Sequence, residues 1–285
     1  MNRLLGIGVC QLQPESNDTQ KNMESLARQI EVMRNYSPWI KLVCAPELSL
    51  QGPYRMAASA QTIPGPITEF CSGLARKHGI YLIPGSLYEQ AGKLIYNTAP
   101  VFDPQGKMVA RYRKMYPWRP YETTASGSET VVFDIKGSGR VGVCICYDLW
   151  FPEVIRDLVW KGAQAIVVPT FTSTQDRNQE IILCRAAAIS NQCYVISINA
   201  LGRDAKGQSL IVDPEGNILQ QAGQLPENLM AMLDLGHVDQ VRKYGTCGVS
   251  RPVASFLHEA HRFPYQEAGA RTPLADTLNM KGVKP

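Results

Sequence analysis

Three polar side chains that could act together in nucleophilic catalysis each follow an apolar, β-prone run of the sequence. Glu47 comes after KLVCAP, Lys114 after VARYR and Cys146 after VGVCI. Because ligands and catalytic groups gather at strand ends in α/β sheets, we expect the three to converge on one pocket. A thiolate can attack a carbonyl carbon, a carboxylate can carry the proton, and a lysine can stabilise the oxyanion. The three residue types therefore predict the chemistry of amide hydrolysis.

The stretch 141–161, VGVCICYDLWFPEVIRDLVWK, predicts a buried strand, a tight turn and the start of a helix. A period of two places Cys144 and Cys146 on one face of the strand, with Cys146 at its end. Pro152 suits a first helical turn, where a missing N–H costs little. A helix N-terminus and a nearby cation would lower the pKa of the thiol, which predicts a nucleophile. The alternative is a buried structural cysteine.

Strands and helices are predicted to alternate along the chain, which indicates an α/β fold with helices covering the faces of a sheet. The predicted helices are 19–36, 70–78 and 177–191. The predicted strands are 4–12, 40–45, 80–88, 94–101, 107–113, 141–146, 165–168, 194–198, 210–212, 217–220 and 229–233.

Two predicted hairpins have nearly the same turn, DPQG at 103–106 and DPEG at 213–216. This internal echo suggests two halves of similar design, each contributing helix-flanked strands to one core. Chance recurrence of a common turn sequence is the alternative.

Composition narrows the classes of protein. The chain has 285 residues, 45% hydrophobic and 19% charged, with a net charge of +4, which is ordinary for a globular enzyme. Lysine and arginine are scattered, so nucleic acid is not the expected partner, and no apolar stretch is long enough to cross a bilayer. The short apolar opening reads as a first strand rather than a lipoprotein signal. Eight cysteines without an export signal predict reduced thiols and a cytoplasmic location.

Three motifs occur in order, APELSLQG, YRKMYPW and GVCICYDLWFPE, and with them the sequence resembles the nitrilase, or carbon–nitrogen hydrolase, superfamily. The resemblance implies that Glu47 is the general base, Lys114 the oxyanion stabiliser and Cys146 the nucleophile, working through a thioester. It implies no metal and no organic cofactor. It also implies that the backbone N–H of Tyr147 joins the oxyanion hole and that Glu122 supports the triad. A surface-loop position for Glu122 is the alternative.

The same resemblance implies an α-β-β-α four-layer sandwich of two similar halves, which fits the echo of the two hairpins. We expect a hydrolase domain over residues 1–243 and an extension over 244–285 that covers a neighbouring subunit. The resemblance also implies a homodimer or higher homo-oligomer, with the helices that follow the nucleophile packed against their mates.

The run after the lysine, MYPW followed by Pro120, Tyr121 and Glu122, resembles the aliphatic amidase and formamidase branch. Two features depart from that branch. Tyr147 and the two residues after it replace the usual acidic residue and Asp-Gly, and Trp150 stands where many members have arginine. Hydrolysis of a small aliphatic amide is therefore the first expectation, followed by cleavage of an N-carbamoyl amine or amino acid and then nitrile hydrolysis. Candidate pocket walls are the aromatic residues Tyr54, Trp118, Trp150 and Phe171.

Other classes of site fit the sequence less well. A Cys–His hydrolase would need an imidazole near the thiol, and none of the four histidines follows a core strand. A metal site made from Cys144, Cys146, His258 and His261 lacks the usual ligand spacing. A non-catalytic protein that binds a small molecule would be favoured by loss of a triad residue, and all three are present.

Overall fold

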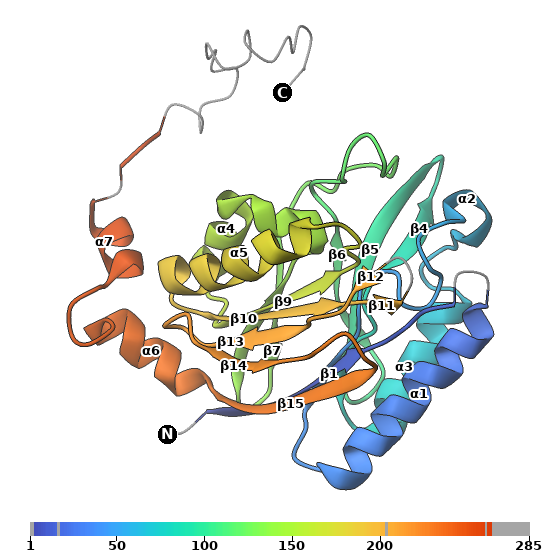
Figure 1. Ribbon diagram of the computed structural model, residues 1–285, viewed down its shortest axis with the longest axis horizontal. Helices are drawn as coiled ribbons and strands as arrows, with labels where there is room; N and C mark the ends of the chain where they lie inside the picture. The colour runs from blue at the N-terminus through green and yellow to red at the C-terminus, as the bar shows by residue number, and fades with distance from the viewer. Residues whose placement is uncertain (1–2, 16–17, 203–204, 260, 264–285) are drawn as a thin grey trace, which may run out of the picture.

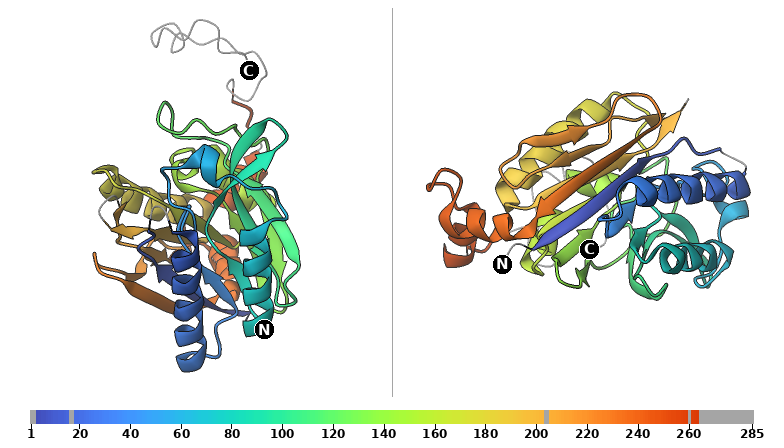
Figure 2. Two further views of the ribbon diagram at one scale, coloured as in Figure 1. Left: turned by 90° about the vertical axis from the view of Figure 1, so that its right-hand side faces the viewer. Right: turned by 90° about the horizontal axis from the view of Figure 1, so that it is seen from below.

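Two β-sheets pack face to face, and helices cover the outer face of each (Figure 1). The structure is a computed structural model that describes residues 3–15, 18–202, 205–259 and 261–263. The two views in Figure 2 show the helix pair α1 and α3 on one side of the molecule and the pair α4 and α5 on the other. The predicted α-β-β-α sandwich is confirmed.

The first sheet has parallel strands at its centre and antiparallel strands around them. β1, β2 and β3 are parallel, β15 pairs antiparallel with β1, and β5 pairs antiparallel with β3, β4 and β6. The spatial order is β15 (Glu227–Asp234), β1 (Leu4–Gln11), β2 (Leu42–Cys44), β3 (Tyr81–Ile83), β5 (Leu94–Phe102) and β4 (Leu87–Ala91), with β6 (Met108–Arg113) also beside β5.

The second sheet repeats this plan. Its parallel centre is β8, β9 and β10, with β7 antiparallel on one side and the hairpin β13–β14 on the other. The spatial order is β14 (Ile218–Gln221), β13 (Leu210–Val212), β10 (Tyr194–Asn199), β9 (Ala165–Thr170), β8 (Gly139–Val143) and β7 (Val131–Ile135). The hairpins β5–β6 and β13–β14 carry the two DPxG turns, so the two halves inferred from that echo are present. A short ribbon, β11 (Leu201–Gly202) with β12 (Ala205–Lys206), stands apart.

The covering helices form where the sequence is amphipathic. α1 (Thr19–Tyr36) buries Leu26, Ile30 and Met33 along one stripe, and its N-cap Asp18 accepts a hydrogen bond from the Lys21 backbone. The remaining helices are α2 (Met56–Ser59), α3 (Pro66–His78), the 3₁₀ helix η1 (Cys146–Trp150), α4 (Pro152–Trp160), α5 (Asp176–Asn191), α6 (Leu235–Tyr244) and α7 (Pro252–Glu259). Over the described ranges, none of the helices is long and apolar enough to span a membrane.

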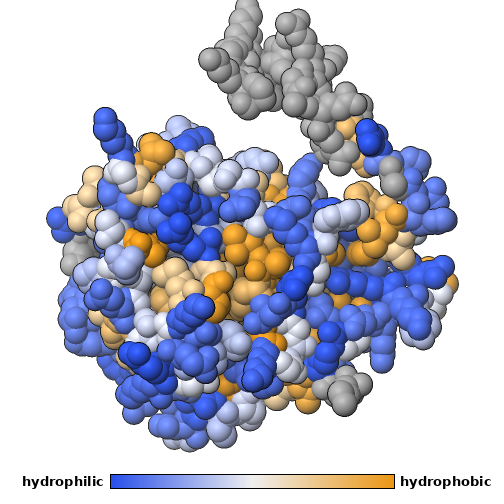
Figure 3. Space-filling model, turned by 180° about the vertical axis from the view of Figure 1, so that it is seen from behind, coloured by the Kyte–Doolittle hydropathy of each residue, from blue (hydrophilic) through white to orange (hydrophobic). Residues whose placement is uncertain are grey.

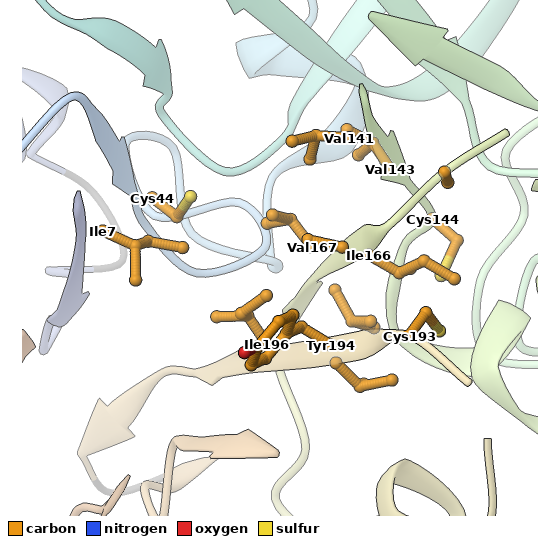
Figure 4. Close-up of a cluster of buried hydrophobic side chains, with 14 of the residues drawn as sticks. Ile7, Cys44, Val141, Val143, Cys144, Ile166, Val167, Cys193, Tyr194 and Ile196 are labelled. Carbon is orange, nitrogen blue, oxygen red and sulfur yellow. The ribbon is translucent and has the colours of Figure 1, made fainter. Parts of the chain in front are cut away.

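Hydrophilic residues cover most of the surface, and apolar residues gather near the middle of the face shown in Figure 3. The core lies between the two sheets and under α4 and α5 (Figure 4), where Ile7, Val143 and Val167 come from three different strands. Because both faces of the central strands are covered, these strands are apolar without alternation. Cys144 and Cys193 are buried in the same cluster.

The predicted strand 80–88 is wrong as one element, because it divides into β3 and β4. Gly85 lies between them with φ +86°, and a Cβ at this position would lie 1.7 Å from the carbonyl oxygen of Pro46. Only glycine allows the two backbones to approach so closely in this conformation. The break between β3 and β4 therefore lets Gly85 pack against Pro46, in the loop that carries Glu47.

Candidate active site

One cavity of about 570 Å³ holds all three residues that the sequence singled out. Glu47 follows β2, Lys114 follows β6 and Cys146 begins η1, and each of them lines the cavity. Glu47 and Lys114 are 4% and 1% exposed, so these two charged side chains are themselves almost completely shielded from water. The predicted convergence of the three side chains is observed.

The cysteine lies on a tight turn rather than at the end of the strand. β8 ends at Val143, so the prediction that the strand continues to Cys146 is wrong. Cys146 has φ +49°, a left-handed conformation that is rare for residues other than glycine and is often found at functional sites. The buried Asp148 carboxylate holds the turn by accepting hydrogen bonds from the backbone N–H groups of Ile145 and Tyr116, both at 2.9 Å.

The thiol is not predisposed to ionise, which corrects the sequence-based expectation of a lowered pKa. Burial raises the pKa of Cys146 well above its ordinary value, and the Glu47 charge raises it further, while Lys114 and the Phe171 backbone N–H oppose both effects. The lowered pKa was expected from a helix N-terminus and a nearby cation alone. α4 begins six residues later, at Pro152, and the desolvation that dominates the thiol comes from the surrounding tertiary structure.

Lys114 is held between two carboxylates. Its Nζ lies 2.9 Å from Glu47 Oε1 and 2.6 Å from Glu122 Oε2. Burial alone would lower the pKa of Lys114, but the charges of Glu47 and Glu122 oppose it, and the pKa is well above its ordinary value. The lysine is therefore a fixed cation. The surface-loop alternative for Glu122 is wrong, because this side chain is largely buried against Lys114.

The two glutamates have pKa values shifted in opposite directions. Burial raises the pKa of Glu47 and the Glu122 charge adds to the rise, while Lys114 opposes it. Burial also acts to raise the pKa of Glu122, but Lys114, Asn97 and the Trp118 backbone N–H lower it overall. Such opposed shifts separate a group that can take up a proton from a group that stays ionised.

Asn97 is part of this charge cluster and was missed by the sequence analysis. Its Nδ2 donates to Glu47 Oε1 at 2.8 Å and to Glu122 Oε1 at 2.9 Å, so one amide orients both carboxylates. Asn97 lies in the middle of β5 and is fully buried beside Thr98. Two polar residues within an otherwise apolar stretch of this strand were the signal that could have identified it.

A second buried polar group near the thiol was also missed. Thr172 Oγ1 lies 3.9 Å from Cys146 Sγ and 2.7 Å from Glu180 Oε1, and Glu180 Oε2 lies 3.0 Å from Arg177 Nη1. Glu180 and Arg177 are one turn apart on α5, where the sequence predicted only an amphipathic helix. An arginine and a glutamate at i and i+3 of the predicted helix were the available signal.

Aromatic residues form much of the remaining wall. Tyr54, Trp118, Trp150 and Phe171 all line the cavity, as the sequence analysis expected of pocket walls. Tyr147 is the second residue of η1 and also lines the cavity, with its ring packed edge-on against Phe151 at a centroid distance of 5.2 Å. Its backbone N–H belongs to the first turn of η1, where helical N–H groups lack partners within the helix.

No set of three or more His, Cys, Asp or Glu side chains is arranged to hold a metal ion within the ranges that the structure describes. Cys144 is buried in the core while Cys146 faces the cavity, so the pair does not act as one ligand set.

Residues 6–243 match the family model described as carbon–nitrogen hydrolase. The chain belongs to this family. The match runs from within β1 to within α6 and so includes strands of both sheets and the elements that position the site. The resemblance expected from the three motifs is therefore confirmed.

Other carbon–nitrogen hydrolases resemble this one in sequence. Formamidases from Bacillus cereus strains B4264 and Q1 are 31% and 32% identical over 219 and 220 residues, and each match covers 73% of this chain. The matched part spans 66% of the length of each of these formamidases.

The fold also matches solved structures of the nitrilase superfamily. Saccharomyces cerevisiae Nit3, a member of branch 10 of that superfamily, is 29% identical with a TM-score of 0.78, covering 87% of this chain and 97% of that one. An amidase from Nesterenkonia AN1 is 25% identical with a TM-score of 0.74, covering 84% and 95%.

Proposed function

We propose that this carbon–nitrogen hydrolase is a cysteine-dependent amidohydrolase that converts a small aliphatic amide to a carboxylic acid and ammonia. The observation that carries the proposal is the position of Lys114, a buried cation held by Glu47 and Glu122 in the same cavity as Cys146. The formamidase relatives and the Nesterenkonia amidase support the same reaction class.

In the proposed acylation step, Cys146 Sγ bonds to the amide carbon while Glu47 takes the thiol proton. The carbonyl oxygen becomes an oxyanion, which Lys114 and the backbone N–H of Tyr147 stabilise. The C–N bond then breaks, and the nitrogen takes the proton from Glu47 and leaves as ammonia. The product is a thioester on Cys146.

Deacylation reuses the same groups. Glu47 takes a proton from a water molecule as its oxygen attacks the thioester carbon, and Lys114 again stabilises the oxyanion. The C–S bond breaks, the proton returns to Cys146 Sγ, and the carboxylic acid leaves. Glu122 does not touch the substrate in this scheme. It keeps Lys114 charged and in place, as its 2.6 Å contact with Nζ suggests.

Charge in the cavity favours a neutral substrate. Among the described residues that line it, Lys114 is the one lysine or arginine, and two carboxylates already bind it. A carboxylate on the substrate would be left without a cation, which counts against N-carbamoyl amino acids. N-carbamoyl amines are the second candidate, because the half-buried Asp176 also lines the cavity and could pair with the ammonium group of a substrate that carries a second amine. Nitriles are the third.

An ammonia-release screen over small amides, ureido compounds and nitriles tests the proposal, with Cys146→Ala as the matched control. We expect release from short aliphatic amides by the wild-type protein and none by the variant. A covalent adduct of the acyl mass on the Cys146 peptide of rapidly quenched wild-type protein would support the thioester. Ammonia release at the wild-type rate by Cys146→Ala would end the proposal, as would release by neither protein from any compound.

We also propose that residues 1–243 form the hydrolase domain and 244–285 an extension, in a cytoplasmic homo-oligomer. The face expected to meet the partner subunit carries the exposed apolar side chains Trp160, Ile182 and Ile189 of α4 and α5. The extension contains α7, whose Phe256 packs edge-on against Trp160 at 6.2 Å. Residue 260 and residues 264–285 of the extension lie outside the described residues. Sedimentation of the full chain tests the assembly.

A further inference from the structure

We propose that Thr172 and Glu180 are positioning residues that keep the Cys146 thiol protonated in the resting site, so that the thiolate forms only when Glu47 takes the proton. The inference rests on the proposed function and concerns the protonation state of the nucleophile before substrate binds. The Thr172 hydroxyl lies between Glu180 and the sulfur and has only one proton to donate.

Glu180 can only accept hydrogen bonds. It is 3% exposed, and its Oε2 lies 3.0 Å from Nη1 of Arg177, a permanently charged guanidinium that is itself buried. A carboxylate in this ion pair has no proton to donate. Thr172 Oγ1, 2.7 Å from Glu180 Oε1, must therefore be the donor in their hydrogen bond.

The rest of Thr172 is also fixed. Its backbone N–H donates to Asn199 Oδ1 at 2.8 Å, and Asn199 Nδ2 donates to the Thr172 carbonyl oxygen at 3.2 Å. These bonds fix the backbone of Thr172, and the contact with Glu180 Oε1 sets the direction of the hydroxyl proton. Since its one proton points to Glu180, only lone pairs remain for Cys146 Sγ, 3.9 Å away. The hydroxyl cannot donate to a thiolate, and its lone pairs disfavour a negative charge on the sulfur. The proton of the thiol is hydrogen-bonded to Glu47.

The other groups that face the sulfur divide into two sets. Lys114 and the Phe171 backbone N–H favour the thiolate, whereas the charges of Glu47 and Glu180 favour the thiol. Three further titratable groups lie near the sulfur. Cys144 and Asp148 are each two residues from Cys146 in the chain, and the carboxylate of Glu122 is paired with Lys114. The Thr172 hydroxyl, like Glu47 and Glu180, favours the neutral thiol.

A neutral resting thiol benefits the proposed mechanism. A standing thiolate would compete with Glu47 for Lys114, the cation that the oxyanion needs. With the thiol neutral, Lys114 stays with its two carboxylates until the substrate arrives, and the sulfur gains charge only as it bonds to carbon. Premature reaction of the sulfur with oxidants or other electrophiles is also suppressed, because the thiolate is the reactive form.

The test measures the pH dependence of alkylation of Cys146 by iodoacetamide, followed by mass spectrometry of the peptide that contains it. Thr172→Val removes the hydroxyl and leaves the Glu180–Arg177 pair intact, and Thr172→Ser is the matched control. We expect the midpoint of the alkylation profile to fall by about one pH unit in Thr172→Val. At a fixed pH below the midpoint the reaction should be roughly three- to fourfold faster, because the larger thiolate fraction is partly offset by the lower nucleophilicity of a thiolate of lower pKa. Thr172→Ser should keep the wild-type profile.

Glu180→Gln should lower the midpoint further, because it removes a charge and lets a side-chain amide donate to Thr172. If Glu180 acts through the hydroxyl, the double variant Thr172→Val, Glu180→Gln should shift less than the sum of the single variants. An unchanged or raised midpoint in a folded Thr172→Val protein overturns the inference, even if Glu180→Gln does not fold. Alkylation does not require turnover, so this result is independent of whether ammonia is released in the substrate screen.

Discussion

The Tyr112 hydroxyl donates a 2.7 Å hydrogen bond to Asp148 Oδ2, and both residues are fully buried. Tyr112 lies on β6, two residues before the catalytic lysine in the proposed mechanism, and Asp148 lies on the turn two residues after the cysteine. This bond therefore joins the segment that carries Lys114 to the turn that carries Cys146. Burial raises the pKa of Asp148 to about 6, while Lys114, Tyr112 and two backbone N–H groups act to lower it.

Tyr112→Phe should destabilise the protein and loosen the site. A buried hydrogen bond to a charged group contributes about 1.5–3 kcal/mol, so we expect the free energy of unfolding in urea to fall by roughly that amount. Tyr36→Phe is the control, because Tyr36 is 83% exposed, and it should have no measurable effect. Equal unfolding curves for Tyr112→Phe and the wild type would show that the bond does not hold the two segments together.

Lys114→Met should slow the chemical step far more than it weakens binding. Loss of an oxyanion donor costs about 10²–10³ in rate, and single-turnover mixing measures it separately from product release. Because the buried carboxylates Glu47 and Glu122 lose their cation, stability must be measured in parallel. Lys93→Met, at an exposed turn, is the matched control. Unchanged single-turnover chemistry in folded Lys114→Met would remove the lysine from its proposed role.

The acid limb of kcat/KM should report the general base. Glu47 must be ionised to take the thiol proton, and burial raises its pKa above the ordinary 4.5. The rate should therefore fall as the pH drops through a value above 4.5. Asn97→Leu removes a hydrogen-bond donor to the ionised form, so the limb should move to higher pH. A limb that stays in place would show that Asn97 does not tune Glu47.

Glu122→Gln should move the same limb in the opposite direction. The Glu122 charge raises the pKa of Glu47, so its removal should shift the acid limb of kcat/KM to lower pH. At the plateau we expect kcat to fall at least about tenfold, or about 1.4 kcal/mol in barrier height, because Lys114 loses a charged partner. Wild-type kcat and an unshifted limb would mean that Glu122 has no supporting role.

A carboxylate on the substrate should lower kcat/KM. Butyramide and succinamate have the same number of carbons and differ in a terminal carboxylate, for which the cavity offers no free cation among its described lining residues. We expect kcat/KM for butyramide to exceed that for succinamate by at least about a hundredfold, or about 2.7 kcal/mol. Equal values would point to a cation that reaches the cavity from elsewhere, such as a neighbouring subunit.

Several elements followed directly from the local sequence. The helical spacing of Leu26, Ile30 and Met33 predicted α1. Sequence could show this because amphipathic spacing and capping involve residues within a few positions of one another. The two DPxG turns predicted the hairpins β5–β6 and β13–β14 for the same reason. The three motifs identified Glu47, Lys114 and Cys146, which the fold brings into one cavity.

The environment of those residues required the tertiary structure. Asn97 is on β5, and Thr172 and Glu180 follow β9, so their contacts with the site join segments that are far apart in the sequence. The sign of the shift in the Cys146 pKa was predicted wrongly, because desolvation depends on how many groups the whole fold packs around the sulfur. Sequence alone determined which residues could perform the chemistry. The tertiary structure decided their protonation and their partners, since burial and distance depend on the packing of the complete chain.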